Sequence, residues 1–252
     1  MKTHILLSTY KKIFMTVIFM TGMTLIFSSC AKKKPKVTVS YTNSVDGAEL
    51  MYHEMIYTND AGNTYNVMRL KYILSQISLH THDGNSILLD DIHFVDSEND
   101  ASVIGEETIE IPVGAYDSLS FTFGLNEKMN VSNAYLAEPV HATMAWPDVM
   151  GGGYHYMRLE GAYLHSDGTQ HFYNTHTGRL QESDNYIELG FPIDLYANTD
   201  ENINLNIDMN INKWYTNPHT YNFEDFEAGI MGNLTAQELL SANGADVFSV
   251  HY

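Results

Sequence analysis

Apolar and polar side chains alternate without interruption between Ile203 and Ile211. A period of two is the spacing of a β-strand that buries one face, whereas an amphipathic helix repeats its apolar side chains about every 3.6 residues. The apolar members of the run are Ile203, Leu205, Ile207, Met209 and Ile211. This segment therefore predicts a long strand with one face in a hydrophobic core.

Less regular alternation predicts further strands over residues 37–41, 66–79, 86–95, 108–111, 118–123, 154–164 and 186–191. Turn sequences such as Asp46-Gly47 and Ser166-Asp167-Gly168 separate these segments. Short strands joined by such turns are typical of an antiparallel sandwich. We therefore predict an all-β fold, a Greek-key-like antiparallel β-sandwich formed by one domain over residues 37–252.

One short C-terminal helix is predicted over residues 235–243. Thr235 can cap its first turn, and Glu238 follows three residues later, as in a capping box. Gly244 stands where a helix commonly ends.

The N-terminus has the three parts of a secretory signal peptide. A basic start with Lys2, Lys11 and Lys12 precedes an apolar run over 13–27, which is shorter than the ~20 residues of a comfortable membrane span. The small residues before Cys30 resemble a lipobox. We predict a lipoprotein signal peptide over 1–29, acylation of Cys30, and a Lys-rich tether over 30–36. The alternative is an uncleaved N-terminal anchor.

Cys30 is also the only cysteine of the chain. An intramolecular disulfide is therefore impossible, and acylation would protect a thiol that export exposes to oxidation. Two acyl signals or more anchor a protein stably in a membrane. We expect a lipid-anchored protein of the cell envelope, periplasmic or outer-membrane.

The charge of the predicted domain is strongly negative. From Val37 onward there are six lysines and arginines against 31 acidic residues, a formal charge of −25. Such a surface repels phosphate backbones, so we expect no nucleic-acid partner. It favours metal ions and basic proteins, although an acidic surface that only confers solubility is an equally valid interpretation.

Motifs of catalysis are absent from the sequence. It contains no G-x-S-x-G elbow, no phosphate-binding loop and no cysteine nucleophile beyond the predicted lipid attachment point. We therefore expect a binding protein and not an enzyme. A carbohydrate-binding or hydrolytic sandwich stays open as an alternative without a motif to support it.

Residues 141–178 hold an unusual concentration of histidine. Its imidazoles are His141, His155, His165, His171 and His176, with methionines and Trp146 between them. Imidazole suits copper and zinc, and thioether sulfur favours Cu(I), so the segment predicts a soft-metal site. In a strand that starts at Tyr154, His155 and Met157 would share one face. Three glycines, 151–153, would let the Trp146 loop pack against that strand.

Two alternatives stand beside this interpretation. A histidine in a strand is more often a surface or hydrogen-bonded core residue than a metal ligand. His80 and His82, two residues apart beside Asp83, form a second candidate pair at a predicted turn.

Six segments in order resemble the MbnP-like family, the methanobactin-associated copper-binding exported proteins. They are V-D-G-A-E-L (45–50), Y-N-V-M-R-L-K-Y-I-L-S-Q-I-S-L (65–79), I-P-V-G-A-Y-D-S-L-S-F-T-F-G-L-N (111–126), M-A-W-P-D-V-M-G-G-G-Y-H-Y-M-R-L-E-G (144–161), N-T-H-T-G (174–178) and N-G-A-D-V-F (243–248). Each segment is weakly specific, and their order and spacing carry the resemblance.

The resemblance implies a β-sandwich with a role in copper handling outside the cytoplasm, storing or delivering Cu(I). It implies a partner, a dihaem protein similar to bacterial cytochrome c peroxidases, which oxidises one tryptophan to kynurenine. Carried over to this sequence, Trp146 is the residue to be oxidised, and His141, His155 and His176 are the copper ligands. The sequence departs from the commoner pattern of two neighbouring tryptophans, because Trp146 stands alone and Trp214 is expected in the core.

A metal-free protein-interaction module on the cell envelope is the alternative function. The 17 tyrosines favour it, because tyrosine is enriched at protein interfaces. The metal content of the protein purified from its host separates the two hypotheses.

Overall fold

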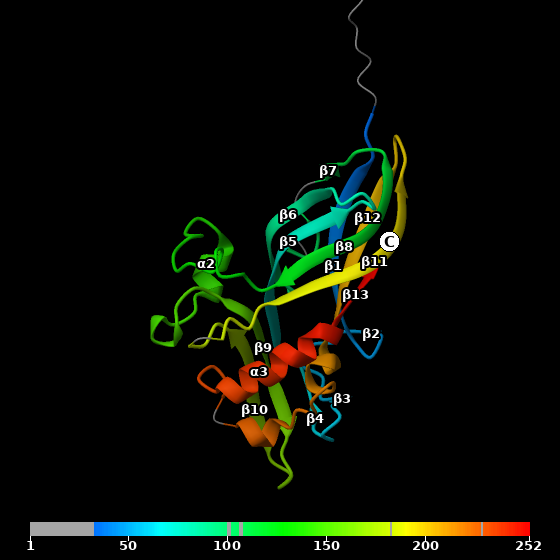
Figure 1. Ribbon diagram of the computed structural model, residues 1–252. Coiled ribbons are helices and arrows are strands. Elements are labelled where there is room, and N and C mark those ends of the chain that lie inside the picture. Colours follow the sequence, from blue (N-terminus) through cyan, green and yellow to red (C-terminus); the bar gives the residue numbers. More distant parts are fainter. Residues whose placement is uncertain (1–32, 100–101, 106–107, 182, 228) are drawn as a thin grey trace, which may run out of the picture. The chain divides into compact units, whose positions relative to one another are not determined.

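Two β-sheets build the folded part of the chain (Figure 1). The computed structural model describes residues 33–99, 102–105, 108–181, 183–227 and 229–252. The predicted signal peptide and Cys30 lie outside these described residues. Within them, no helix is both long enough and apolar enough to cross a membrane.

The smaller sheet has the strand order β13-β12-β1-β2, with β7 paired to β1. Its strands are β1 (Lys36–Val45), β2 (Ala48–Glu49), β7 (Ile109–Glu110), β12 (Asn202–Asn210) and β13 (Phe248–His251). In β12 the apolar side chains are buried, as the alternation predicts. β12 pairs with β1 in parallel, so this sheet departs from the purely antiparallel arrangement we expected.

The larger sheet has the order β11-β8-β5-β9-β4-β3, with β6 beside β5 and β10 beside β9. Its strands are β3 (Tyr57–Thr58), β4 (Thr64–Tyr65), β5 (Arg69–His80), β6 (Ser86–Asp96), β8 (Gly114–Phe123), β9 (His155–Leu164), β10 (Gln170–Gly178) and β11 (Ile187–Ala197). All its ladders are antiparallel. The predicted all-β sandwich is therefore confirmed.

The core between the two sheets is rich in aromatic side chains. Phe248 of β13 lies with its ring centroid 5.3 Å from that of Phe121 and 5.8 Å from that of Phe123, both in β8. Trp214, in the short 3-10 helix η3 (Ile211–Tyr215), packs 4.8 Å from Phe123. Trp214 is therefore a core residue, as the sequence predicts.

Helical structure is short and peripheral to the sheets. The expected C-terminal helix is α3 (Leu234–Asn243), whose N-cap is Asn233, since its side chain accepts a hydrogen bond from the amide of Ala236. The predicted cap at Thr235 is thus two residues late. A second helix, α2 (Pro139–Met144), was not expected, and the remaining 3-10 turns are η2 (Asp148–Met150), η4 (Phe223–Phe226) and η5 (Gly244–Asp246).

Candidate metal centre

A β-bulge in the β9–β10 hairpin decides which histidines meet. Opposite residues of a ladder share a face, and here His176 pairs with Arg158 while Gly178 pairs with His155. Arg158 and His155 are three positions apart in β9, whereas their partners His176 and Gly178 are two positions apart in β10. The extra residue of β9 therefore turns His155 onto the face of His176. Met157, opposite Thr177, therefore lies on the other face and is fully buried. Our expectation that His155 and Met157 share a face was wrong, because regular alternation does not anticipate a bulge.

The three consecutive glycines hold the Trp146 loop over this face. All three have positive φ, at 119°, 67° and 84° for Gly151, Gly152 and Gly153. Residues that carry a Cβ rarely adopt this backbone conformation. The amide of Trp146 donates to the carbonyl of Gly153 at 2.9 Å, which closes the loop. The predicted role of the glycines is confirmed by this geometry.

Trp146 packs tightly into the site, with only 3% of its surface exposed. Its ring lies edge-on to that of His155, at a centroid distance of 4.7 Å and an interplanar angle of 81°. Gly178 lies beneath the indole, where an added Cβ would come within 2.8 Å of Cε3. The indole Nε1 is buried and has no hydrogen-bond partner among the described residues.

His155 is a buried imidazole with one nitrogen free. Its Nδ1 lies 3.1 Å from the carbonyl oxygen of Met144. A carbonyl can only accept, so Nδ1 carries the proton and Nε2 keeps its lone pair. Burial, aided by nearby His176 and Arg158, lowers the pKa of His155 to about 4. The side chain is therefore neutral and able to bind a metal at physiological pH.

His176 is oriented by a carboxylate. Its Nε2 donates to Oε1 of Glu160 at 2.9 Å, so Nδ1 is the ring nitrogen that a metal could use. Glu160 also accepts from Arg158 and Arg69, each at 2.7 Å. The His176 hydrogen bond and the Arg158 charge hold the pKa of Glu160 at about 2. A carboxylate behind a histidine is the outer-shell arrangement that metal-binding imidazoles commonly have.

Helix α3 fixes the backbone of this part of β10. Gln237 is fully buried, and its Nε2 donates to the carbonyl of His176 at 2.8 Å. Its Oε1 accepts from the amide of Gly178 at 3.2 Å. The position of His176 is therefore set by the fold on both sides, through Glu160 and Gln237.

His155 and His176 approach each other as two ligands of one ion would. Their ring centroids are 5.2 Å apart with an interplanar angle of 82°. Two imidazoles that bind one metal through nitrogens at about 2.0 Å and at a roughly tetrahedral angle have centroids about 5 Å apart. The arrangement can therefore hold a metal with two imidazole nitrogens beside the Trp146 ring.

The other predicted candidates lie elsewhere. His141, in α2, has its Nδ1 3.4 Å from the hydroxyl of Tyr154 and makes its ring contact with that tyrosine. It shares a depression of about 350 Å³ with Trp146. Among the described residues, the ligand atoms of His141, His155 and His176 do not all lie within 4.8 Å of one another. His80 bonds Ser120, whereas His82 is fully exposed near Asp117, so these two do not form a pair.

Comparison with known proteins agrees with this architecture. The sequence profile of the MbnP family matches residues 34–232, most of the chain. The chain belongs to the MbnP family. The structure is similar to that of MbnP from Methylosinus trichosporium, with a TM-score of 0.57 and 14% identity over 86% of this chain and 98% of that one. A search of curated proteins finds no match.

Within this MbnP-family chain, sequence reasoning missed the residues that orient the histidines. Glu160 and Gln237 carry no motif, and only the alternation of charged and apolar residues over 158–160 hints that Glu160 faces outward with Arg158. Gly178 was noted only as part of N-T-H-T-G. Its close packing against the Trp146 ring depends on the register of the β9–β10 hairpin.

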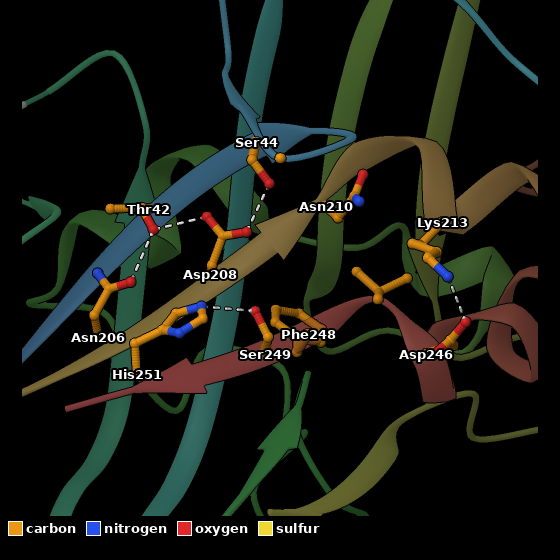
Figure 2. Close-up of a pocket in the computed structure, with 12 residues that line it drawn as sticks. Thr42, Ser44, Asn206, Asp208, Asn210, Lys213, Asp246, Phe248, Ser249 and His251 are labelled. Atoms are coloured by element: carbon orange, nitrogen blue, oxygen red, sulfur yellow. Dashed lines mark hydrogen bonds and ion pairs between the residues drawn. The ribbon is translucent and has the colours of Figure 1, made fainter.

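A second depression lies on the smaller sheet of this MbnP-family fold, and Figure 2 shows its lining. Its volume is about 640 Å³. The carboxylate of Asp208 accepts hydrogen bonds from Thr42 and Ser44, and Lys213 pairs with Asp246. These polar groups satisfy one another, and among the described lining residues the one phenyl or indole ring is that of Phe248, which is buried. The groove thus lacks the exposed aromatic platform that sugar binding would need.

Proposed function

We propose that the mature protein binds one Cu(I) ion as cargo between His155 and His176, for storage or delivery in the cell envelope. The observation that carries this proposal is the edge-on approach of the two imidazoles at a centroid distance of 5.2 Å. Both have a free nitrogen, and His155 resists protonation down to about pH 4. Imidazole suits copper as well as zinc, and membership of the MbnP family favours copper.

A third donor would come from Trp146 after oxidation to kynurenine. The Trp146 ring already lies in T-shaped contact with His155, at a centroid distance of 4.7 Å. Two equivalents of hydrogen peroxide convert an indole to N-formylkynurenine with release of two waters, and hydrolysis then releases formate. A dihaem peroxidase-like partner would catalyse this oxidation with peroxide as oxidant. The product offers an amine and a ketone oxygen next to the histidine pair.

Membrane attachment through acylated Cys30 is part of the same proposal. The described domain starts a few residues after Cys30, so a short Lys-rich tether would hold the copper site near the membrane surface. Lipid anchoring places the protein in the cell envelope, where a periplasmic or outer-membrane location gives access to imported copper.

Competition for Cu(I) with a coloured chelator tests the ligand assignment. We expect one tightly bound Cu(I) per chain, lost or weakened at least tenfold in His155→Ala and in His176→Ala. His82→Ala is the matched control, because this fully exposed histidine lies outside the site. Binding that is unchanged in both site variants would refute the assignment, and the absence of stoichiometric binding would refute the function.

Peptide mass spectrometry tests the modification. The protein is isolated from its host, or treated with the dihaem partner and peroxide, and the Trp146 peptide is compared with the Trp214 peptide. We expect kynurenine only at Trp146, since Trp214 is a core residue. Unmodified Trp146 in copper-loaded protein would contradict the proposed third donor.

A further inference from the structure

A second group of histidines and carboxylates lies at the far end of the β9–β10 hairpin (Figure 1). His165 follows β9, Asp167 lies in the turn, and His171 is the second residue of β10. Glu224 and Glu227 come from the region of η4, more than fifty residues later in the chain. The cluster thus joins two segments that are distant in sequence.

The two imidazoles are stacked, with centroids 4.6 Å apart and planes 17° from parallel. On one edge, Nδ1 of His165 lies 3.1 Å from the carboxylate of Asp167 and accepts a hydrogen bond from the Asp167 amide, also at 3.1 Å. Nε2 of His171 lies on the same side, 2.9 Å from the hydroxyl of Thr169, which itself donates to Asp167. One ligand atom from each of His165, Asp167 and His171 lies within 4.8 Å of the others.

The opposite edge of the stacked rings faces glutamates. Oε1 of Glu227 lies 2.9 Å from Nδ1 of His171 and 3.5 Å from Nε2 of His165. Oε2 of Glu224 lies 3.4 Å from the same His165 nitrogen. The hydroxyl of Tyr163 donates to Glu227 at 2.9 Å and so fixes its position. His165 therefore has one nitrogen toward Asp167 and the other toward the two glutamates, and His171 has one toward Thr169 and the other toward Glu227.

The charge of the cluster is unbalanced. It contains three carboxylates, and in the described part of the chain no lysine or arginine forms an ion pair with them. A divalent cation between His165, His171 and Asp167 would offset this charge.

We propose that His165, Asp167 and His171 bind a divalent ion of the zinc class. The ion would bind Nδ1 of His165 and Nε2 of His171 in place of their hydrogen bonds with the Asp167 amide and the Thr169 hydroxyl. The opposite N–H groups would then donate to Glu227 and Glu224, the usual outer shell of a metal-binding histidine. Two imidazoles and a carboxylate are a donor set for Zn²⁺, whereas Cu(I) prefers softer ligands and Ca²⁺ an all-oxygen shell. The half-exposed edge leaves room for water as a further ligand.

This site is separate from the proposed copper site. His171 and His176 are five residues apart in β10, which corresponds to about 16 Å along a strand, and an odd spacing points them to opposite faces. The zinc-class ion would link the hairpin tip to the η4 segment, because its histidine ligands also contact Glu224 and Glu227. Its role would be to stabilise the fold around the hairpin.

Titration of Zn²⁺ alone into the copper-free full chain in detergent tests the site. Calorimetry should give one Zn²⁺ per chain, and the Tm should rise by about 5 °C at roughly a hundredfold excess over Kd, since an ion that binds only the native state adds stability. Co²⁺ bound to the wild-type chain should show visible absorption that Zn²⁺ abolishes. This second measurement does not depend on the folding of any variant.

Variants separate this site from the copper site. His171→Gln should weaken Zn²⁺ binding at least ~100-fold and remove the Tm rise, and Glu227→Gln should weaken it about tenfold through loss of the outer shell. The double variant His155→Asn/His176→Asn should bind Zn²⁺ as the wild type does. No Zn²⁺ binding by the wild type, unchanged binding in His171→Gln, or loss of binding in the double variant would each overturn the proposal. None of these outcomes depends on whether Cu(I) binds.

Discussion

The buried, neutral state of His155 predicts how the stability of the metal-free protein depends on pH. In the unfolded chain a histidine has a pKa near 6.5. Burial lowers the pKa of His155 in the folded protein to about 4. Between these values the unfolded chain binds a proton that the folded chain refuses, so the free energy of unfolding rises with pH across this window.

The size of the effect follows from the difference in pKa. About 2.5 pH units at about 1.4 kcal/mol each correspond to about 3 kcal/mol, fully present above pH ~6.5 and lost as the pH falls toward ~4. His155→Asn is the informative substitution, because the amide nitrogen of asparagine can replace Nδ1 as donor to the Met144 carbonyl. It removes the titrating group and keeps the hydrogen bond.

Chemical unfolding of the metal-free protein at several pH values provides the measurement. The curve of unfolding free energy against pH for His155→Asn should be flatter than that of the wild type between about pH 4 and about pH 6.5, by the equivalent of one proton. His82→Asn, at a fully exposed histidine, is the control and should keep the wild-type slope. Equal slopes for the wild type and His155→Asn would refute the claim that His155 is neutral because it is buried.

Three further predictions concern the surroundings of the site. Gly178→Ala would place a Cβ 2.8 Å from the Trp146 ring, so denaturant unfolding should show a loss of about 1–3 kcal/mol, and chelator competition should show weaker Cu(I) binding. Glu160→Gln should weaken Cu(I) binding, because it leaves His176 without its carboxylate partner. The pKa of Glu160 is lowered to about 2, so the stability that this carboxylate contributes is present above pH ~4.5 and is lost as the pH falls toward 2; the variant should lack this acid-dependent loss. Cys30→Ala should move the protein from the membrane to the soluble fraction, with intact mass spectrometry showing acylation of the wild type only, and membrane retention of an unacylated chain would contradict the anchor.

The alternation of apolar and polar residues predicted most strands, because each of them buries apolar side chains on one face. It missed β10, whose buried face includes Thr175 and Thr177 instead of aliphatic residues. It also missed β13, which is only four residues long. The parallel pairing of β1 with β12 joins segments more than 150 residues apart, and alternation within a strand holds no information about its partner.

The histidine-rich segment was recognisable from the sequence, and so were the glycines that shape the Trp146 loop. Sequence reasoning could also name His155 and His176 through the family resemblance. It could not decide that His141 would contact Tyr154 instead, because the orientation of α2 depends on packing against β9.

Composition, spacing and side-chain chemistry determined the all-β class, the acidic surface, the single cysteine and the supply of imidazoles in residues 141–178. Only the tertiary structure decided which imidazoles meet. One extra residue in β9 turns His155 toward His176, and Glu160, Gln237 and Gly178 then hold that pair beneath Trp146. The physical reason is that a strand's period of two is a local property, whereas a bulge and a hairpin register are set by the combined packing of neighbouring strands.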